Sequence, residues 1–240
     1  MNDLSFFTRK IEEFLTPYLS MKIDKKTISC PYWMNKLKNG KVVARGMYNG
    51  KGTARQIQYC IQKRLEKNPD QKRCLKSVVS LVKYARSIRA GIDCSGLAFR
   101  ILNKLIQLNY RGCNERTLRD IFTGGIRKTN SKMLTSAPFA VPVNKWQNYR
   151  LGDLIRINGV HHVAVILTVT NDLLTYVHSS WSTEVTGVHK GTIQRVKNEG
   201  GLAVQKWDER TKTGENFGDK YFHQDKGDGV YRLKFFNNYG

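Results

Sequence analysis

The sequence predicts an α+β fold, with helices in the first half of the chain and an antiparallel sheet in the second. Apolar residues recur at helical spacing before residue 108, whereas short apolar runs typical of strands begin after Leu151. The turn dipeptide Asn171-Asp172 joins two of these runs as in a hairpin. With 240 residues, of which 40% are hydrophobic, the chain can bury a sizeable core, which excludes collagen-like, low-complexity and fully disordered chains.

Four helices are expected before the first strand. The first spans 4–19, and the last, which has the clearest apolar face, runs from about Cys94 to Leu108. Between them, helices over about 54–67 and 71–88 are separated by Asn68-Pro69-Asp70. The residues expected to face the core are Phe7, Ile11, Leu15 and Leu19 in the first helix, Leu75, Val78, Val79, Val82 and Ala85 in the third, and Leu97, Ile101, Leu105 and Leu108 in the fourth.

Strands are expected over 154–157, 163–169 and 173–177, with the last two joined by the turn at Asn171-Asp172. The segment 183–240 mixes turn residues with short strand candidates and ends in a candidate strand over 230–236. The segment 20–53 is mixed, with a Lys-rich link, Cys30-Pro31-Tyr32-Trp33 and a loop punctuated by glycines.

The chain is strongly basic, because 41 Lys and Arg against 19 Asp and Glu give a net charge of +22. Residues 1–90 carry 20 basic and 6 acidic side chains, a net +14. A charge of this size favours anionic partners, such as nucleic acid, an acidic wall polymer or a lipid surface, although a solvated basic face also explains it. The helix over 71–88 is expected to leave Lys72, Arg73, Lys76 and Lys83 for solvent or an anion.

Neither a membrane span nor a secretory signal is expected. The longest aliphatic run, Val163 to Leu167, is far shorter than the ~18 residues that a membrane helix needs. The N-terminal Met1-Asn2-Asp3-Leu4 lacks the basic start and long apolar stretch of a signal peptide. We therefore expect a chain that is cytoplasmic at synthesis.

The five cysteines form no Cys-x-x-Cys pair, and no Cys/His spacing is typical of zinc, so no metal site is predicted. Their odd number, in a chain without a signal peptide, indicates reduced thiols. The sequence context of Cys30, Cys60, Cys74 and Cys113 is that of small core residues.

Cys94 differs because it begins a helix within Asp93-Cys94-Ser95-Gly96. The N–H groups of a first helical turn and the helix dipole favour a thiolate and can hold an oxyanion, so we expect a nucleophile with a lowered pKa. The alternative is a buried cysteine at a helix start. By contrast, Gly50-Lys51-Gly52-Thr53 is not a phosphate loop, because the required glycine spacing and a preceding strand are missing.

A nucleophilic thiol needs a base, and the chain has five histidines. His162 opens one expected strand and His178 ends its partner, as a base and the group that orients it would. His161 faces the other side of the strand, and His189 and His223 are expected to be hydrogen-bonded surface histidines. For His162 and His178 to share a face, the loop between their strands must have an odd length or the strands a bulge with the same effect.

Together these motifs resemble the NlpC/P60 cysteine peptidase family. The resemblance rests on Asp93-Cys94-Ser95-Gly96 before an apolar helix, Gly152-Asp153-Leu154 leading to His162-Val163-Ala164-Val165, Val177-His178-Ser179, and Pro31-Tyr32-Trp33, which is similar to the family's Pro-Tyr-x-Trp segment. It covers roughly residues 30–36 and 91–180. About 60 residues separate Tyr32 from Asp93, where the family usually has a short spacing, so the position of Tyr32 stays open.

The resemblance implies a papain-like core, with the nucleophile helix packed on an antiparallel sheet and an extra basic helical insertion at about 54–88. With the helix over 4–19, this divides the chain into an N-terminal helix and basic link over 1–27 and a catalytic domain over 28–240. The implied site is Cys94 as nucleophile, His162 as base and His178 as the orienting third member, with Tyr32, Asp93 and Ser95 in substrate binding. The implied reaction is hydrolysis of amide bonds in peptidoglycan stem peptides, without a cofactor. From their charge, the basic helices are expected to hold such an enzyme on an anionic wall polymer. A phage lysin or an injected effector would reach that wall without a signal peptide.

Two other classes of function stay open. The same Cys/His pair could serve a thiol acyltransferase or a lipid hydrolase, although related acyltransferases generally place the histidine before the cysteine. The charge could instead belong to a nucleic-acid-binding module with an inactive site. Against that class, the sequence shows no zinc finger, no RNA-binding aromatic signature and no plain helix-turn-helix.

Overall fold

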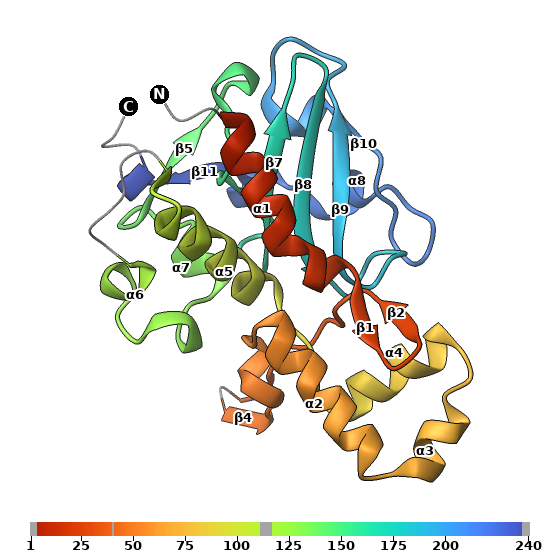
Figure 1. The fold of residues 1–240 in the computed structure, drawn as a ribbon. Helices are drawn as coiled ribbons and strands as arrows, with labels where there is room; N and C mark the ends of the chain where they lie inside the picture. The colour runs from red at the N-terminus through yellow and green to blue at the C-terminus, as the bar shows by residue number, and fades with distance from the viewer. Residues whose placement is uncertain (1–3, 40, 111–116, 237–240) are drawn as a thin grey trace.

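The computed structural model describes residues 4–39, 41–110 and 117–236 and has the expected α+β architecture (Figure 1). The helices are α1 (Leu4–Leu19), α2 (Ala54–Glu66), α3 (Pro69–Cys74), α4 (Val78–Ser87), α5 (Cys94–Gln107), α6 (Leu118–Ile121), α7 (Ser131–Leu134) and α8 (Phe217–Tyr221). The strands are β1 (Met21–Ile23), β2 (Lys26–Ile28), β3 (Lys36–Lys38), β4 (Lys41–Ala44), β5 (Ala140–Val143), β6 (Leu154–Ile157), β7 (His162–Val169), β8 (Leu173–Ser180), β9 (Gly187–Gln194), β10 (Lys206–Trp207) and β11 (Gly229–Leu233).

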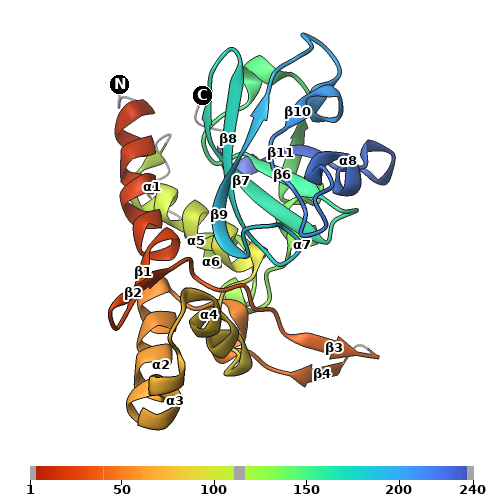
Figure 2. The same cartoon turned by 90° about the vertical axis from the view of Figure 1, so that its right-hand side faces the viewer.

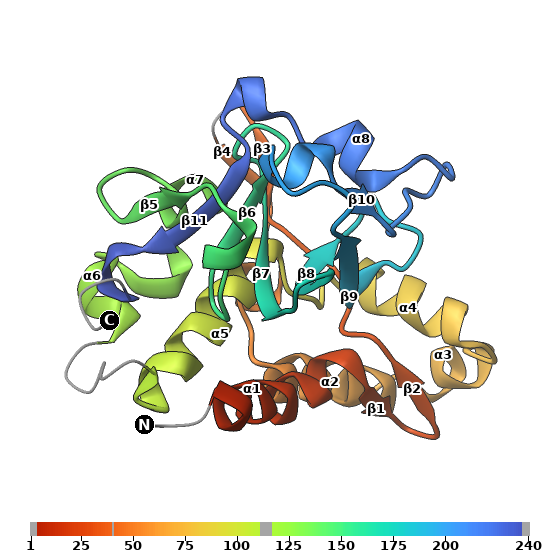
Figure 3. The same cartoon turned by 90° about the horizontal axis from the view of Figure 1, so that it is seen from above.

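One antiparallel sheet organises the described part of the chain, with seven strands in the order β10-β9-β8-β7-β6-β11-β5. Because side chains alternate between the faces of a strand, each face of the sheet contributes to a different apolar cluster. One cluster joins the sheet to α1 and α5, and the other lies on the opposite face with β10 and α8. Figure 3 shows α1 and α5 on one side of β7–β9 and α8 on the other.

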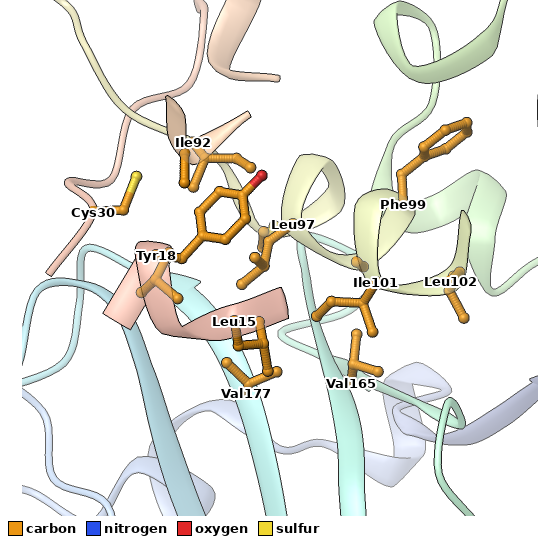
Figure 4. Close-up of a cluster of buried hydrophobic side chains, with 14 of the residues drawn as sticks. Leu15, Tyr18, Cys30, Ile92, Leu97, Phe99, Ile101, Leu102, Val165 and Val177 are labelled. Carbon is orange, nitrogen blue, oxygen red and sulfur yellow. The ribbon is translucent and has the colours of Figure 1, made fainter. Parts of the chain in front are cut away.

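Helix α5 is fixed by burial on two sides. Its Leu97 and Ile101 are fully buried, and Figure 4 shows them next to Leu15 of α1 and to Val165 and Val177 of the sheet. Burying an aliphatic side chain of this size contributes about 1.5–3 kcal/mol, so several such residues hold the helix firmly against β7 and β8. The first residue of α5, Cys94, is therefore held at a defined place beside the sheet.

The strand pairing brings His162 and His178 to the same face. Residues 170 and 173 pair across a two-residue turn, which alone would put His178 on the wrong side. A bulge at Leu167 changes the register, so that Thr168 pairs with Thr175 but Ile166 pairs with Tyr176. The prediction of an odd loop, or of a bulge with the same effect, is confirmed.

The helix predicted over 71–88 is wrong as a single element. It is interrupted between α3 and α4, because Ser77 caps a new helix and exchanges hydrogen bonds with Ser80 in a capping box. Val78 and Val79 consequently begin that helix on its solvent side and are 47% and 62% exposed, although both were expected in the core.

Lys72, which was expected to be left for solvent or an anion, forms an ion pair with Asp24 at 3.3 Å. The side chains of Arg73 and Cys74 and all of Cys113 lie outside the described residues.

The helical insertion lies at one end of the molecule, where Figure 2 shows α2, α3 and α4 grouped below the sheet. Its inner side chains Ile57, Ile61 and Leu81 belong to the same apolar cluster as α1 and α5. None of the helices in the described ranges has the length and apolar character needed to cross a membrane.

Candidate active site

Cys94 is the first residue of α5 and is 7% exposed. Asp93 caps this helix, since its Oδ1 accepts the Gly96 N–H at 2.6 Å. The backbone N–H groups of Ser95 and Val163 act on the thiol and lower its pKa, which puts the sulfur beside the residue that follows His162.

The expectation of a lowered Cys94 pKa is wrong. Burial, together with the charge of Asp93, raises the pKa of this thiol to about 11. Lys51 and the two backbone N–H groups act in the opposite direction but are outweighed. The helix start therefore supplies hydrogen-bond donors, whereas the resting thiol keeps its proton at neutral pH.

Lys51 belongs to the Gly50-Lys51-Gly52-Thr53 segment and lies next to the first turn of α5. Its Nζ donates to Asp93 Oδ1 at 2.7 Å and to Ser95 Oγ at 2.5 Å, and Lys51 itself is 7% exposed. Burial raises the pKa of Asp93, although Lys51 opposes this shift. Lys51, Asp93 and Ser95 therefore form a buried polar cluster that orients the first turn of α5.

Tyr32 lies near Cys94, although about 60 residues separate the two in the chain. The strand-like segment around it pairs with the residues before Cys94, because Ile92 N–H donates to Pro31 O at 2.9 Å and Trp33 N–H to Ile92 O at 3.3 Å. Burial raises the pKa of Tyr32, and the charges of Cys94 and Asp93 raise it further, as expected for a phenol close to both. After the helices α2, α3 and α4, the chain thus comes back beside Tyr32 at Ile92.

The two predicted histidines are in direct contact. His162 Nε2 lies 2.8 Å from His178 Nδ1, with the rings nearly perpendicular. Burial, together with the neighbouring His178, lowers the pKa of His162 to about 3, so this imidazole is neutral at physiological pH. His161 is exposed, in keeping with its position on the other side of the strand.

Glu209 and His189 extend this contact, and the sequence analysis did not predict either as a site residue. Glu209 Oε1 lies 3.0 Å from His178 Nε2 and 2.5 Å from His189 Nε2, and the Tyr176 hydroxyl donates to Glu209 Oε2. Burial alone would raise the pKa of Glu209, but His178 and His189 outweigh it and hold that pKa well below its usual range. The carboxylate is therefore charged behind the histidine pair.

The expectation of a surface position for His189 is wrong, because it is 8% exposed and lies in β9 directly opposite His178. His223, by contrast, is half-buried and directly precedes the 3₁₀ turn after α8. Glu209 follows β10 in the tail, where no apolar periodicity marks it. Direct pairing of β9 with β8, which turn signals alone do not reveal, is what brings these groups together.

His178, His189 and Glu209 are also the described group whose side chains could hold a metal ion, since one ligand atom of each lies within 4.8 Å of the others. Comparison of the chain with protein-family models, with curated proteins and with solved structures finds no match.

In chemical terms, the site offers a thiol at a helix start, a neutral imidazole backed by a second imidazole and a carboxylate, and a nearby phenol.

Proposed function

We propose that the chain is a cysteine amidohydrolase of the NlpC/P60 type, with a papain-like core, that cleaves amide bonds in peptidoglycan stem peptides. Cys94 is the nucleophile, His162 the base and His178 the residue that orients it. Tyr32 lies beside the bound substrate, and Asp93 and Ser95 act on the substrate site through the buried cluster that orients the start of α5. The reaction class is supported by the geometry, and the substrate class by the sequence motifs that resemble the family.

One observation carries the proposal: His162, whose imidazole is hydrogen-bonded to His178 at 2.8 Å, directly precedes Val163, whose backbone N–H acts on the thiol at the start of α5. A cysteine that only fills the core needs neither a polar neighbour nor a histidine pair beside it. A thiol, a base and an orienting group on three separate elements form the arrangement that nucleophilic catalysis requires.

The hydrogen bonds behind His162 define where its protons lie. Glu209 is charged and can only accept, so His178 Nε2 donates to it and His178 Nδ1 keeps a lone pair. His162 Nε2 then donates to His178 Nδ1, which leaves the lone pair of His162 Nδ1 for the thiol proton. Glu209 thus acts through His178 as a positioning residue that fixes the tautomer of the base.

Catalysis begins with the protonated thiol, because its pKa is about 11. His162 Nδ1 takes the proton as Cys94 Sγ attacks the carbonyl carbon, and the C=O electron pair moves to the oxygen. The N–H of Ser95, which lies beside the thiol, is positioned to stabilise this oxyanion. The C–N bond then breaks, the amine leaves with the proton from His162, and water hydrolyses the thioester with His162 again as base.

The proposal is tested by incubating the protein with purified muropeptides and identifying the products by mass spectrometry. Cleavage is expected, and Cys94→Ala should reduce the rate by at least about 10³-fold, because the nucleophile is lost. Cys30→Ala is the matched control, since Cys30 is fully buried in the same cluster and is not the nucleophile. Wild-type rates in Cys94→Ala would contradict the proposal.

The same assay separates the other classes of function. Transfer of the acyl group to an added amine, or release of fatty acid from a lipid ester, would make the protein an acyltransferase or lipid hydrolase. Binding of nucleic acid that persists in moderate salt, without any turnover, would favour the binding module, because purely phosphate-driven binding weakens steeply as salt rises.

A further inference from the structure

The structure points to a zinc site formed by His178, His189 and Glu209, and we infer that Zn²⁺ bound there switches off the base. Glu209 Oε1 lies 2.5 Å from His189 Nε2 and 3.0 Å from His178 Nε2, and the two Nε2 atoms lie 2.9 Å apart. Two imidazoles and a carboxylate form a ligand set that zinc uses in proteins, with a fourth position left open.

Each of the three side chains is held by a partner on its other polar atom. His189 Nδ1 lies 3.0 Å from the Gly187 carbonyl, which can only accept, so the proton is on Nδ1 and the Nε2 lone pair is free for a ligand role in the neutral ring. His178 Nδ1 contacts His162, and Glu209 Oε2 accepts from Tyr176. Outer partners of this kind orient the ligands of protein metal sites.

The distances suit an ion after a small expansion. A zinc ion about 2.0–2.1 Å from three tetrahedral ligands separates their atoms by roughly 3.3 Å, so each pair has to move apart by less than about 1 Å. Bound zinc would take the place of the direct contacts that now join Glu209 Oε1 to His189 Nε2 and to His178 Nε2.

A cavity of about 220 Å³ gives the site a route to solvent, and both His189 and Glu209 line it. Its wall also carries two basic residues, but both are engaged: Lys190 Nζ donates to Glu12 at 2.7 Å, and Arg210 donates to the Gly214 carbonyl at 3.0 Å. The acidic Asp208 and Glu184 lie on the same wall. The open fourth position of the ion would face this cavity.

The consequence for His162 rests on the proposed function. Zinc on His178 Nε2 forces the proton of that ring onto Nδ1, which then donates to His162 Nε2. The proton of a neutral His162 must then lie on Nδ1, the atom that accepts the thiol proton in the proposed mechanism. Zinc therefore stabilises the wrong tautomer of the base and inhibits without touching the nucleophile.

Binding is tested by titrating the Cys94→Ala protein with Zn²⁺ in a calorimeter, so that the catalytic thiol cannot contribute. One ion per chain is expected, and His189→Asn and Glu209→Gln should each weaken binding by about tenfold or more. Two variants serve as controls. Glu184 lines the same cavity without belonging to the ligand set, and His223 is a histidine outside that set, so Glu184→Gln and His223→Asn should bind zinc as tightly as the parent does. The inferred site would be overturned if the Cys94→Ala protein bound no zinc. It would also be overturned if folded His189→Asn and Glu209→Gln variants bound zinc as tightly as that parent protein does.

X-ray absorption on the zinc-loaded wild-type protein keeps the test valid if a variant fails to fold. Two imidazoles and oxygen around zinc are expected, whereas a sulfur neighbour would place the ion on a cysteine and overturn the inference. Zinc should also slow muropeptide hydrolysis by the wild-type enzyme. Zinc binding at the expected ligands by a protein that cleaves nothing would overturn the proposed function alone, and cleavage without zinc binding would overturn the zinc site alone.

Discussion

Asp93 acts on Cys94, the proposed nucleophile, in two opposing ways. Its carboxylate caps α5 and so fixes the position of Cys94, but its charge also raises the pKa of the thiol. Lys51 offsets part of that charge through the contact at 2.7 Å. The site therefore combines precise placement of the thiol with a resting protonated state, and in the proposed mechanism His162 removes the proton during attack.

Replacing Asp93 with Asn should make Cys94 more reactive toward a small alkylating reagent. Asn caps a helix about as well as Asp, so α5 should stay in place, while the charge of Lys51 is left uncompensated beside the thiol. Loss of a nearby negative charge should lower the thiol pKa by roughly 1–2 units. The alkylation rate between about pH 7 and pH 9 follows the thiolate fraction, so it should rise by about 10- to 100-fold.

Ser95→Ala is the control for this measurement, because it removes the other partner of Lys51 without changing a charge. The alkylated peptide is identified by mass spectrometry, which separates Cys94 from Cys30 and Cys60. An unchanged or slower rate in Asp93→Asn would show that the carboxylate does not control the pKa of the thiol.

For individual residues, the sequence predicted only the contacts that follow from regular patterns within helices and paired strands. The meeting of His162 and His178 follows from side-chain alternation along paired strands, together with the bulge at Leu167. Glu209 is 31 positions from His178, and Lys51 is 44 positions from Ser95, in segments without a periodic pattern. Their contacts depend on tertiary packing, which one-dimensional spacing does not contain.

Among the elements, the start of β9 depends on a glycine. The segment before Tyr32 passes so close to Gly187 that a Cβ there would lie 2.4 Å from the Cys30 carbonyl oxygen. Gly187 also has a φ of +101°, which side-chain-bearing residues rarely adopt. This close approach lets Val188 N–H donate to Cys30 O at 2.9 Å and ties β9 to the Tyr32 segment.

Gly187→Ala should therefore destabilise the protein strongly. We expect a loss of about 3 kcal/mol or more in the free energy of unfolding, from backbone strain and the clash together. Gly214→Ala is the matched control, because Gly214 has a φ of +85° but a Cβ added there would meet no atom within 4 Å, and it should lose only about 1 kcal/mol. Urea denaturation measures both, and equal losses would mean that the close approach contributes nothing.

The sequence predicted the elements whose apolar pattern is long and regular, namely α1, α2, α5 and β6 to β8. It failed where a single polar residue decides the outcome, as at Ser77, whose capping box divides the expected third helix. Strand β9 was not delimited, because its Gly187, Lys190 and Gly191 interrupt the alternation that marks a half-buried strand.

For the whole molecule, residues 1–90, which include α2, α3 and α4, carry a net charge of +14 out of +22. We propose that this charge holds the protein on an anionic wall polymer. Lys76 and Lys83 are exposed there, whereas Lys72 is partly neutralised by Asp24. Reversing Lys76 and Lys83 to Glu should weaken binding to whole walls several-fold in low salt, with little effect at high salt, because exposed charges are screened.

Cleavage of a small soluble muropeptide by this double variant should stay within about twofold of wild type, because steering of a polymer does not enter that reaction. Lys145→Glu with Lys197→Glu is the charge-matched control, since both are exposed outside these helices. A pull-down on purified walls measures binding. Equal loss on walls and on the soluble substrate would show that the helices shape the active site instead.

The most direct test of Cys94 as the nucleophile is capture of the covalent intermediate. The wild-type protein is mixed with a muropeptide, quenched in acid during turnover and examined by intact and peptide mass spectrometry. A thioester-linked stem peptide on the Cys94 peptide, removed by hydroxylamine and absent from Cys94→Ala, is the predicted result. Cleavage that proceeds without any adduct, or an adduct on Cys30 or Cys60 instead, would contradict the proposed mechanism.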